Sequence, residues 1–203
     1  PSSSASDVYK RQDGQEVLSP DLPIAHGYCR PYNYIELPDE EGLFELRDVP
    51  HGTLTQEFYK SKISDNWEKL IVYLPPCVPS AGLPVLYLQH GFGESEISWS
   101  TTGKVNFLMD NLIAAGKIKP FAIVMGNGMV KQRIDGELKL NRALYGQMLV
   151  EEILPMIEKK YQFGGSKEKR GMAGLSMGSV QTTRTICAHP CLLYTSPSPR
   201  DRQ

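Results

Sequence analysis

A serine between two glycines is the residue of this sequence best suited to covalent chemistry. The pattern Gly-x-Ser-x-Gly runs from Gly174 to Gly178 and centres on Ser176. A short strand pattern at 170–173 precedes it and a helical pattern at 179–188 follows it, so the serine stands at a sharp strand-to-helix turn. The pattern alone is weak, and a plain glycine-rich turn is the alternative. Its context favours a serine nucleophile, whose chemistry is acyl transfer.

A second motif supplies hydrogen-bond donors that acyl transfer needs. Residues 89–93 are Gln-His-Gly-Phe-Gly, directly at the end of the apolar run that covers 83–89. We expect the backbone N–H groups of Phe92 and Met177 to form an oxyanion hole, because negative charge develops on the attacked carbonyl oxygen. Loss of one such donor costs about 3 to 4 kcal/mol in related sites. His90 is predicted to be a turn residue whose ring bonds nearby backbone, and not a catalytic base.

The sequence lacks partners for this serine. A serine nucleophile needs a histidine base and an acid that orients the base. Where the serine lies in a Gly-x-Ser-x-Gly turn between strand and helix, both partners follow it in the chain. Three of the four histidines come too early, namely His26, His51 and His90. His189 follows Ser176, but a continuous helix with a rise of about 1.5 Å per residue would place its ring roughly 20 Å away. The later acid is Asp201, close to the end of the chain. We therefore predict that the chain as written is inactive.

Three side chains after the second motif have open assignments. Glu94 and Glu96 either line a substrate cleft or lie on a solvated loop face, and the loop face is favoured. Trp99 either packs against an aromatic or sugar substituent of a substrate or belongs to the core, and neither assignment is preferred.

The two ends of the chain have a common origin at the level of DNA. Residues 6–12 can be encoded by TCA GAT GTG TAT AAG AGA CAG, whose reverse complement, read from its second base, encodes the Cys-Leu-Leu-Tyr-Thr-Ser of residues 191–196. Two polar disordered tails would have no reason to show this relation. We therefore interpret residues 1–12 and 191–203 as translated sequencing-adapter DNA, which is excluded from fold reasoning.

Composition excludes some classes of function. Of the 22 Lys and Arg residues four lie in these ends, and of the 23 Asp and Glu residues two do, so the remainder has a net charge near −3. Binding to nucleic acid needs a clustered basic footprint, which is missing. No apolar run between residues 13 and 190 is long enough to span a bilayer. The remaining cysteines, Cys29, Cys77 and Cys187, lack metal-ligand spacing, and we expect neither a metal nor an organic cofactor.

The chain divides near residue 50. Residues 13–50 are rich in turns, with candidate strands at 32–37 and 43–46, and are predicted to be the end of a small all-β domain plus a linker; an irregular extension of the next domain is the alternative. From residue 51 apolar runs alternate with amphipathic helical stretches, which is typical of an α/β fold with a mostly parallel sheet flanked by helices. The expected strands cover 54–63, 69–74, 83–89, 121–125 and 170–173. The expected helices cover 105–115, 144–161 with a kink at Pro155, and 179–188.

Taken in order, these segments resemble a known family. They include Leu-Pro-Pro at 74–76, residues 85–93 with Trp99, Asp-Asn-Leu-Ile at 110–113 followed by Gly-Lys-Ile-Lys-Pro at 116–120, Glu-Glu-Ile-Leu-Pro at 151–155, and residues 173–178. The set is similar to the esterase branch of the α/β-hydrolase superfamily that contains esterase D and xylanase-linked feruloyl esterases. The resemblance covers residues 51–190. Ser179 stands where many members have a third glycine.

The resemblance implies a fold, a reaction and a domain boundary. It implies a truncated α/β-hydrolase fold, Ser176 as nucleophile, Phe92 and Met177 as oxyanion donors, and an Asp and a His further along a complete chain. Residues 47–52 resemble the junction between an immunoglobulin-like domain and an esterase domain, so residues 13–48 are expected to be the last strands of the first domain.

The function implied is that of a serine carboxylic ester hydrolase, of feruloyl or acetyl-xylan type, acting on plant cell-wall polysaccharide. The expected partner is an ester of a small molecule or of a polysaccharide, with no nucleic acid and no membrane. Two alternatives stay open: an esterase of thioesters or siderophores with the same fold, and a non-catalytic carbohydrate-binding protein with a relic esterase domain.

Overall fold

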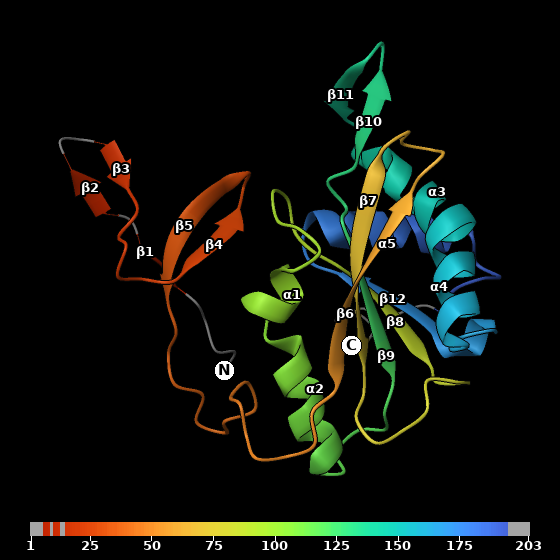
Figure 1. Cartoon of the computed structure of the whole chain (residues 1–203), viewed down its shortest axis with the longest axis horizontal. Helices are drawn as coiled ribbons and strands as arrows, with labels where there is room; N and C mark the ends of the chain where they lie inside the picture. Colours follow the sequence, from red (N-terminus) through yellow and green to blue (C-terminus); the bar gives the residue numbers. More distant parts are fainter. Residues whose placement is uncertain (1–5, 9, 13–14, 195–203) are drawn as a thin grey trace, which may run out of the picture.

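A five-stranded sheet organises the chain from residue 53 onward. Its strand order is β12-β8-β9-β7-β6, as the ribbon in the computed structural model shows (Figure 1). The structure describes residues 6–8, 10–12 and 15–194. The strands of the sheet are β6 (Thr53–Lys60), β7 (Trp67–Leu74), β8 (Val85–Gln89), β9 (Ala122–Gly126) and β12 (Arg170–Gly174). All five agree with strands predicted from the sequence to within a few residues at each end.

The sheet is mixed. β12, β8 and β9 pair in parallel, whereas β9 pairs antiparallel with β7, and β7 antiparallel with β6. The prediction of a mostly parallel sheet holds for the strands that alternate with helices. It does not hold for β6 and β7, because only residues 61–66 join them and so short a connection permits only an antiparallel pair.

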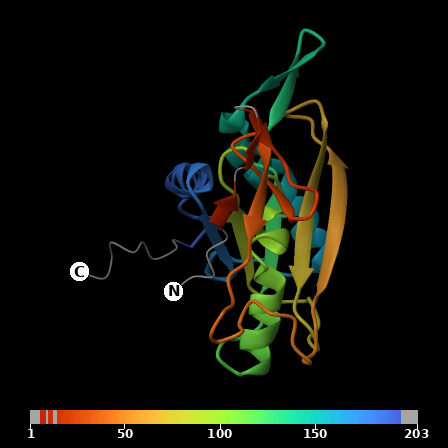
Figure 2. The ribbon, with the colours of Figure 1, turned by 90° about the vertical axis from the view of Figure 1, so that its left-hand side faces the viewer.

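Helices cover both faces of the sheet, as Figures 1 and 2 show from two directions. One face carries α1 (Ser98–Thr101) and α2 (Val105–Ala114). The other carries α3 (Tyr145–Met148), the π-helix η2 (Leu149–Ile153), α4 (Leu154–Tyr161) and α5 (Met177–Ala188). Two short 3₁₀ segments are η1 (Arg142–Leu144) and η3 (Lys167–Lys169). The α/β class predicted from the alternating pattern is therefore confirmed.

The helical stretch predicted at 144–161 is continuous, but its hydrogen-bonding changes along its length. The π-helix η2 ends where α4 begins, and Pro155 lies in the first turn of α4. Proline has no N–H to donate to the preceding turn, and a wider turn accommodates that loss. A kink is expected at Pro155, and the structure has a π-helical turn just before this residue.

The core lies in two layers, one on each face of the sheet. The layer under α3, α4 and α5 includes Leu70, Val72 and Tyr87, and the layer under α2 includes Ile71 and Tyr73. Successive residues of β7 therefore enter opposite layers, and β9 is buried along its whole length. This burial on both faces explains the near-continuous apolar runs in the sequence.

The N-terminal region forms small antiparallel sheets beside this body. β1 (Ser6–Val8), β5 (Arg30–Ile35) and β4 (Ile24–Gly27) form one, and β2 (Lys10–Gln12) and β3 (Gln15–Val17) form the other. β5 confirms most of the strand predicted at 32–37. Since β1 and β2 pair through backbone groups that any sequence provides, the adapter origin of residues 1–12 stays a prediction.

The strand predicted at 43–46 is wrong. Residues 40–45 form turns, because the Asp39 carboxylate accepts hydrogen bonds from the backbone N–H of Leu43 at 2.5 Å and of Phe44 at 3.1 Å. Those bonds also hold the pKa of Asp39 below its usual value, although burial acts in the opposite direction. A side chain that bonds backbone a few residues ahead replaces the ladder a strand would need.

A hairpin that the sequence analysis missed projects from the carboxyl edge of the sheet. It consists of β10 (Lys131–Ile134) and β11 (Glu137–Leu140), at the top of Figure 1. Its turn is Asp135-Gly136, and both residues have positive φ, 51° and 82°. Asp-Gly between short alternating segments is the usual signal for such a turn, so the sequence contained the information.

The linker is fastened to α2 by two neighbouring polar side chains. Asn111 Nδ2 donates to the carbonyls of Leu43 and Glu45 at 2.8 and 2.9 Å. Asp110 is 2% exposed and accepts from the Gly52 N–H at 3.0 Å and the Tyr73 hydroxyl at 2.5 Å. The Asp-Asn pair of the family resemblance therefore has a structural role.

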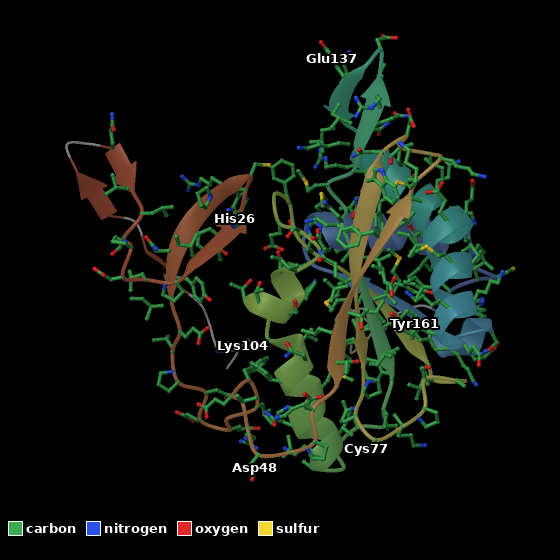
Figure 3. All side chains as sticks on the ribbon, in the orientation of Figure 1. His26, Asp48, Cys77, Lys104, Glu137 and Tyr161 are labelled. Atoms are coloured by element: carbon green, nitrogen blue, oxygen red, sulfur yellow. The ribbon has the colours of Figure 1, made fainter. Side chains whose placement is uncertain are left out.

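Two further contacts strengthen the same junction. His51 Nδ1 lies 3.0 Å from Asp110 Oδ2, and His51 Nε2 lies 3.0 Å from the Arg47 carbonyl. Lys104, labelled in Figure 3 just before α2, pairs with Glu36 at 2.5 Å. The segment after β5 is thus held against the body built on the five-stranded sheet at several points.

Replacement of Asp110 by alanine should destabilise the fold by about 3 kcal/mol, because it leaves the buried Tyr73 hydroxyl and Gly52 N–H without their acceptor. Urea unfolding of the chain measures this loss. Asp48→Ala is the matched control, since Asp48 is exposed and should change stability by less than about 0.5 kcal/mol. Equal effects of the two substitutions would contradict the assigned role.

A buried carboxyl predicts a pH dependence of stability. Burial raises the pKa of Glu68, the hydrogen bond from Ser64 opposes this in part, and the neighbouring carboxylates of Glu152 and Glu96 raise it further. The folded state therefore holds this proton more tightly than the unfolded state. Its contribution to stability is complete below the ordinary pKa of Glu and is lost as the pH rises through the raised value.

Glu68→Gln has no proton to lose. We expect the free energy of unfolding of Glu68→Gln to rise relative to that of the unaltered chain as the pH increases from about 4 to 7. Urea unfolding at several pH values measures the difference. A difference that stays constant with pH would show that Glu68 does not titrate in this way.

Candidate functional site

Ser176 occupies a strained turn between strand and helix. β12 ends at Gly174 and α5 begins at Met177. The backbone of Ser176 has φ 52° and ψ −112°, a region that residues with a Cβ rarely adopt, and its side chain is exposed. The strand-turn-helix context predicted for the Gly-x-Ser-x-Gly pattern is confirmed. Strain of this kind at an exposed serine is typical of a functional position.

The flanking glycines are required by close packing. A Cβ on Gly174 would lie 2.4 Å from the Gly178 carbonyl carbon, and a Cβ on Gly178 would lie 2.7 Å from the carbonyl oxygens of both Gln89 and His90. No side chain fits at these separations. α5 therefore starts directly against the end of β8, and the serine is raised at the edge of the sheet.

The same contact brings the second sequence motif beside the serine. β12 and β8 are parallel neighbours with Gly174 opposite Gln89, and the Leu175 N–H donates to the Gln89 carbonyl at 3.1 Å. Because parallel strands end at the same edge of a sheet, the loop after β8 and the turn after β12 lie together. Phe92 and Met177 belong to these two adjacent segments.

His90 is a structural residue. It is 1% exposed, its Nδ1 donates to the Gly91 carbonyl at 2.7 Å, and its Nε2 accepts from the Gly128 N–H at 2.9 Å. Both ring nitrogens are thus occupied by backbone, in the arrangement of a neutral imidazole. The prediction that His90 bonds nearby backbone is confirmed, and its ring joins the loops that follow β8 and β9.

Phe92 is held on both sides by neighbouring residues. Its carbonyl accepts from the Tyr28 N–H at 3.0 Å, and the guanidinium of Arg142 lies 5.0 Å from its ring centroid. Among the described residues, the Phe92 N–H has no protein acceptor. Met177 is the first residue of α5, and the N–H groups of a first helical turn have no partner within the helix. Both groups are chemically able to bind an oxyanion.

Three of the four histidines are bonded elsewhere or lie at a distance from Ser176. The ring of His51 bonds Asp110 and Arg47, and that of His90 bonds backbone. His189 caps the far end of α5, after twelve helical residues, which corresponds to about 18 Å of helix. The separation expected from the sequence therefore follows from the observed helix.

Burial resolves two of the three open assignments, those of Glu96 and Trp99. Glu94 lines a cleft of about 420 Å³ and accepts from the Gly91 N–H at 2.8 Å. Glu96 is 1% exposed and pairs with Lys69 Nζ at 2.9 Å, so the favoured solvated face is wrong for it. Trp99 packs against the core layer under α2, which selects the core assignment.

One support of the site, Gln181, was not identified from the sequence. Gln181 on α5 donates to the carbonyls of Gly128 at 3.0 Å and Arg142 at 3.1 Å, which ties the elbow helix to the loop after β9. An Asn-Gly pair directly after a buried strand was the available signal for that loop. Ser179, at the place of the family's third glycine, donates to the Ser176 carbonyl at 2.7 Å.

Within the described ranges, no group of three or more His, Cys, Asp and Glu side chains is arranged to hold a metal ion. Likewise, none of the described helices has the length and apolar character needed to cross a bilayer.

Comparisons with known proteins agree with this geometry. The family model described as "Putative esterase" matches residues 61–191, more than half of the chain. An endo-1,4-beta-xylanase/feruloyl esterase of Xylanibacter ruminicola is 37% identical over 187 residues, which are 88% of this chain and 26% of that protein. The chain thus spans about a quarter of the length of this curated relative.

Solved structures show the same fold. A structure named as a ferulic acid esterase is 29% identical, with a TM-score of 0.62 over 70% of this chain and 58% of that one. A ferulic acid esterase of Anaeromyces mucronatus is 21% identical, with a TM-score of 0.68 over 77% of this chain and 60% of that one. The fold is the α/β-hydrolase fold, and the chain belongs to the family described as "Putative esterase".

Proposed function

We propose that the complete protein is a serine carboxylic ester hydrolase that removes feruloyl or acetyl groups from plant cell-wall polysaccharide. The observation that carries the proposal is the backbone of Ser176, strained and exposed at the turn between β12 and α5. The relative with 37% identity is named a xylanase/feruloyl esterase, which supports the substrate class. The 29% identical structure named as a ferulic acid esterase supports the acyl group.

The proposed reaction has two steps. Ser176 Oγ attacks the ester carbonyl carbon while a histidine takes its proton, and collapse of the tetrahedral intermediate releases the alcohol, which receives that proton. A water molecule then attacks the acyl-serine, the same histidine takes a proton from the water, and the carboxylic acid leaves with Ser176 restored. No redox change and no cofactor are needed.

Phe92 and Met177 are proposed as the oxyanion donors. Their N–H groups lie on the two segments that meet at the ends of β8 and β12. The bond from the His90 ring to the Gly91 carbonyl holds the peptide that carries the Phe92 N–H, and the start of α5 holds the peptide that carries the Met177 N–H. Donors held before the reaction need no reorganisation when charge develops, and this is how they lower the barrier.

The domain assignment is part of the proposal. Residues 13–50 are the remnant of an immunoglobulin-like domain with its linker, residues 51–190 are the first part of the esterase domain, and residues 1–12 and 191–203 come from adapter DNA. Tyr194 bridges to Gly171 at the outer edge of β12. In the complete protein we expect a further strand on this edge, followed by the missing Asp and His.

Ser176→Ala in the complete protein should lower kcat/KM for a feruloylated oligosaccharide by at least about 10⁴-fold, because no other group replaces the nucleophile. Release of ferulate measures the rate. Ser80→Ala is the control, since Ser80 lies between β7 and β8 at the opposite edge of the sheet, and its rate should change by less than about twofold. Similar rates for the two variants would refute Ser176 as nucleophile.

The chain of 203 residues should release no ferulate above the uncatalysed rate, because it holds Ser176 without a base. Extension of the chain past Pro190 with the natural sequence should restore hydrolysis. Hydrolysis by the unextended chain that is abolished by Ser176→Ala would show that the described residues already contain the base.

A further inference from the structure

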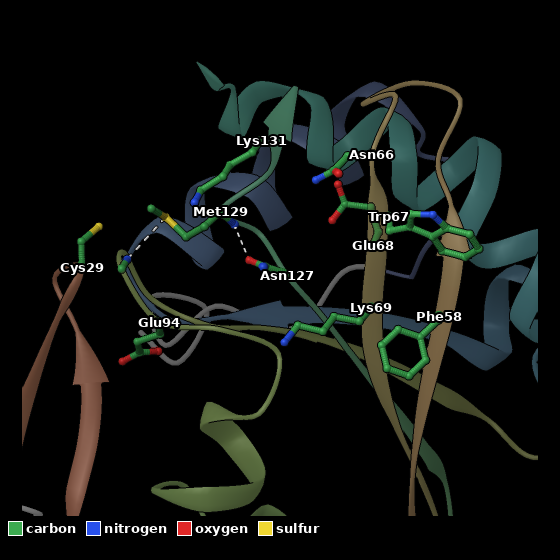
Figure 4. A pocket seen from close by; sticks show the side chains of 11 residues that line it. Cys29, Phe58, Asn66, Trp67, Glu68, Lys69, Glu94, Asn127, Met129 and Lys131 are labelled. Atoms are coloured by element: carbon green, nitrogen blue, oxygen red, sulfur yellow. Dashed lines mark hydrogen bonds between the residues drawn. The ribbon is translucent and has the colours of Figure 1, made fainter. Parts of the chain in front are cut away.

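An open cleft lies at the same ends of the sheet strands as Ser176. It is the cleft of about 420 Å³ that Glu94 borders. Figure 4 shows its other walls, formed by Phe58 on β6, Trp67 and Lys69 on β7, and Lys131 at the start of β10. None of these four residues has a part in the proposed hydrolysis, so the cleft needs a separate explanation.

Two aromatic side chains are left uncovered here by the sheet register. Phe58 lies opposite Lys69, and Trp67 is two residues before Lys69 on the same face. Further along that face of β7, Ile71 and Tyr73 are buried under α2, but the helix does not extend to Trp67. Trp67 is 66% exposed and Phe58 is 62% exposed. Adjacent large aromatics at such exposure mark a binding surface.

The charges in the cleft favour a neutral ligand. Its walls contain two lysines, Lys69 and Lys131, and two glutamates, Glu68 and Glu94. Lys69 is already paired with Glu96 at 2.9 Å, and burial raises the pKa of Glu68, so Lys131 and Glu94 remain as one charge of each sign. The remaining polar lining includes the side-chain amides of Asn66 and Asn127, which can donate and accept hydrogen bonds. Exposed aromatic rings together with uncharged side-chain amides suit a ligand rich in hydroxyl groups.

The position of the cleft fits the alcohol side of an ester. Its lining includes Gly93, the residue after the proposed oxyanion donor, and Phe58 on β6. β6 lies three strands from β8, which corresponds to about 14 Å. A chain molecule bound along this path would run from the reacting group across the edge of the sheet.

We propose that this cleft binds the uncharged polysaccharide chain that carries the ester, with sugar rings stacked on Trp67 and Phe58. The inference rests on the proposed function and names the leaving-group side of its substrate. The aromatic acyl group is a poorer occupant, because such groups favour enclosed, mostly apolar pockets. This cleft is open, and lysine and glutamate side chains form part of its lining.

Binding is measured first, without any ester. All lining residues belong to the chain of 203 residues, so calorimetric titration of this chain with unesterified xylo-oligosaccharide tests the cleft directly. We expect Trp67→Ala to weaken binding by about tenfold, and Phe58→Ala to weaken it as well. Leu54→Ala is the control, since Leu54 lies on β6 at the opposite end of the strand from Phe58 and is 43% exposed.

Two outcomes of the titration would overturn the inference. One is absence of oligosaccharide binding by the unaltered chain, and the other is equal binding by the unaltered chain and Trp67→Ala. Binding of free ferulate that Trp67→Ala abolishes, in place of sugar binding, would assign the cleft to the acyl group and also refute it. A far-ultraviolet spectrum of each variant identical to that of the unaltered chain shows that folding is intact.

Kinetics of the complete protein provide a second, independent test. Trp67→Ala should raise KM about tenfold for a feruloylated oligosaccharide and leave kcat unchanged, and it should leave both constants unchanged for methyl ferulate, which has no sugar. Equal effects on the two substrates would contradict a sugar site. If the complete protein hydrolyses neither ester, the proposed function fails, while the titration still decides what the cleft binds.

Discussion

The structure depends on one close approach, that of α5 to the end of β8. Two glycines permit it, since a Cβ on Gly174 or Gly178 would lie within 3 Å of backbone atoms. The approach forces Ser176 into a left-handed backbone conformation and lifts its side chain out of the sheet. It also sets the Leu175 N–H against the Gln89 carbonyl, which joins the end of β8 to the turn that carries the serine. Packing between backbones, and not the chemistry of the serine itself, thus defines the site.

From this contact the rest of the functional edge follows. The parallel strands β12, β8 and β9 end together, and the His90 ring joins the loop after β8 to the loop after β9. β7 and β6 bring Trp67 and Phe58 to the same edge because they run antiparallel to their neighbours. The mixed sheet therefore places the proposed reaction beside β12 and β8, and the open aromatic cleft beside β7 and β6, along the same edge. A polymeric substrate can use both at once.

Much of this could be predicted from the sequence, and the failures have physical causes. The elbow, the five strands and the role of His90 follow from local patterns, namely glycine spacing, apolar runs and turn position. The burial of Glu96 could not be seen, because its partner Lys69 lies on a distant strand. The strand predicted at 43–46 is absent because the hydrogen bonds that Asp39 accepts from the Leu43 and Phe44 N–H groups override β propensity. The cleft depends on where α2 stops relative to β7, which only tertiary packing determines.

The central claim is that Ser176 is an activated nucleophile in the complete protein. The most direct test is reaction with an alkyl fluorophosphonate, in which the serine oxygen displaces fluoride from phosphorus, followed by mass spectrometry of proteolytic peptides. The account predicts one phosphonyl group per molecule, on the peptide that contains Ser176, and none on Ser176→Ala. A complete protein that hydrolyses esters but carries the label on another residue would contradict it.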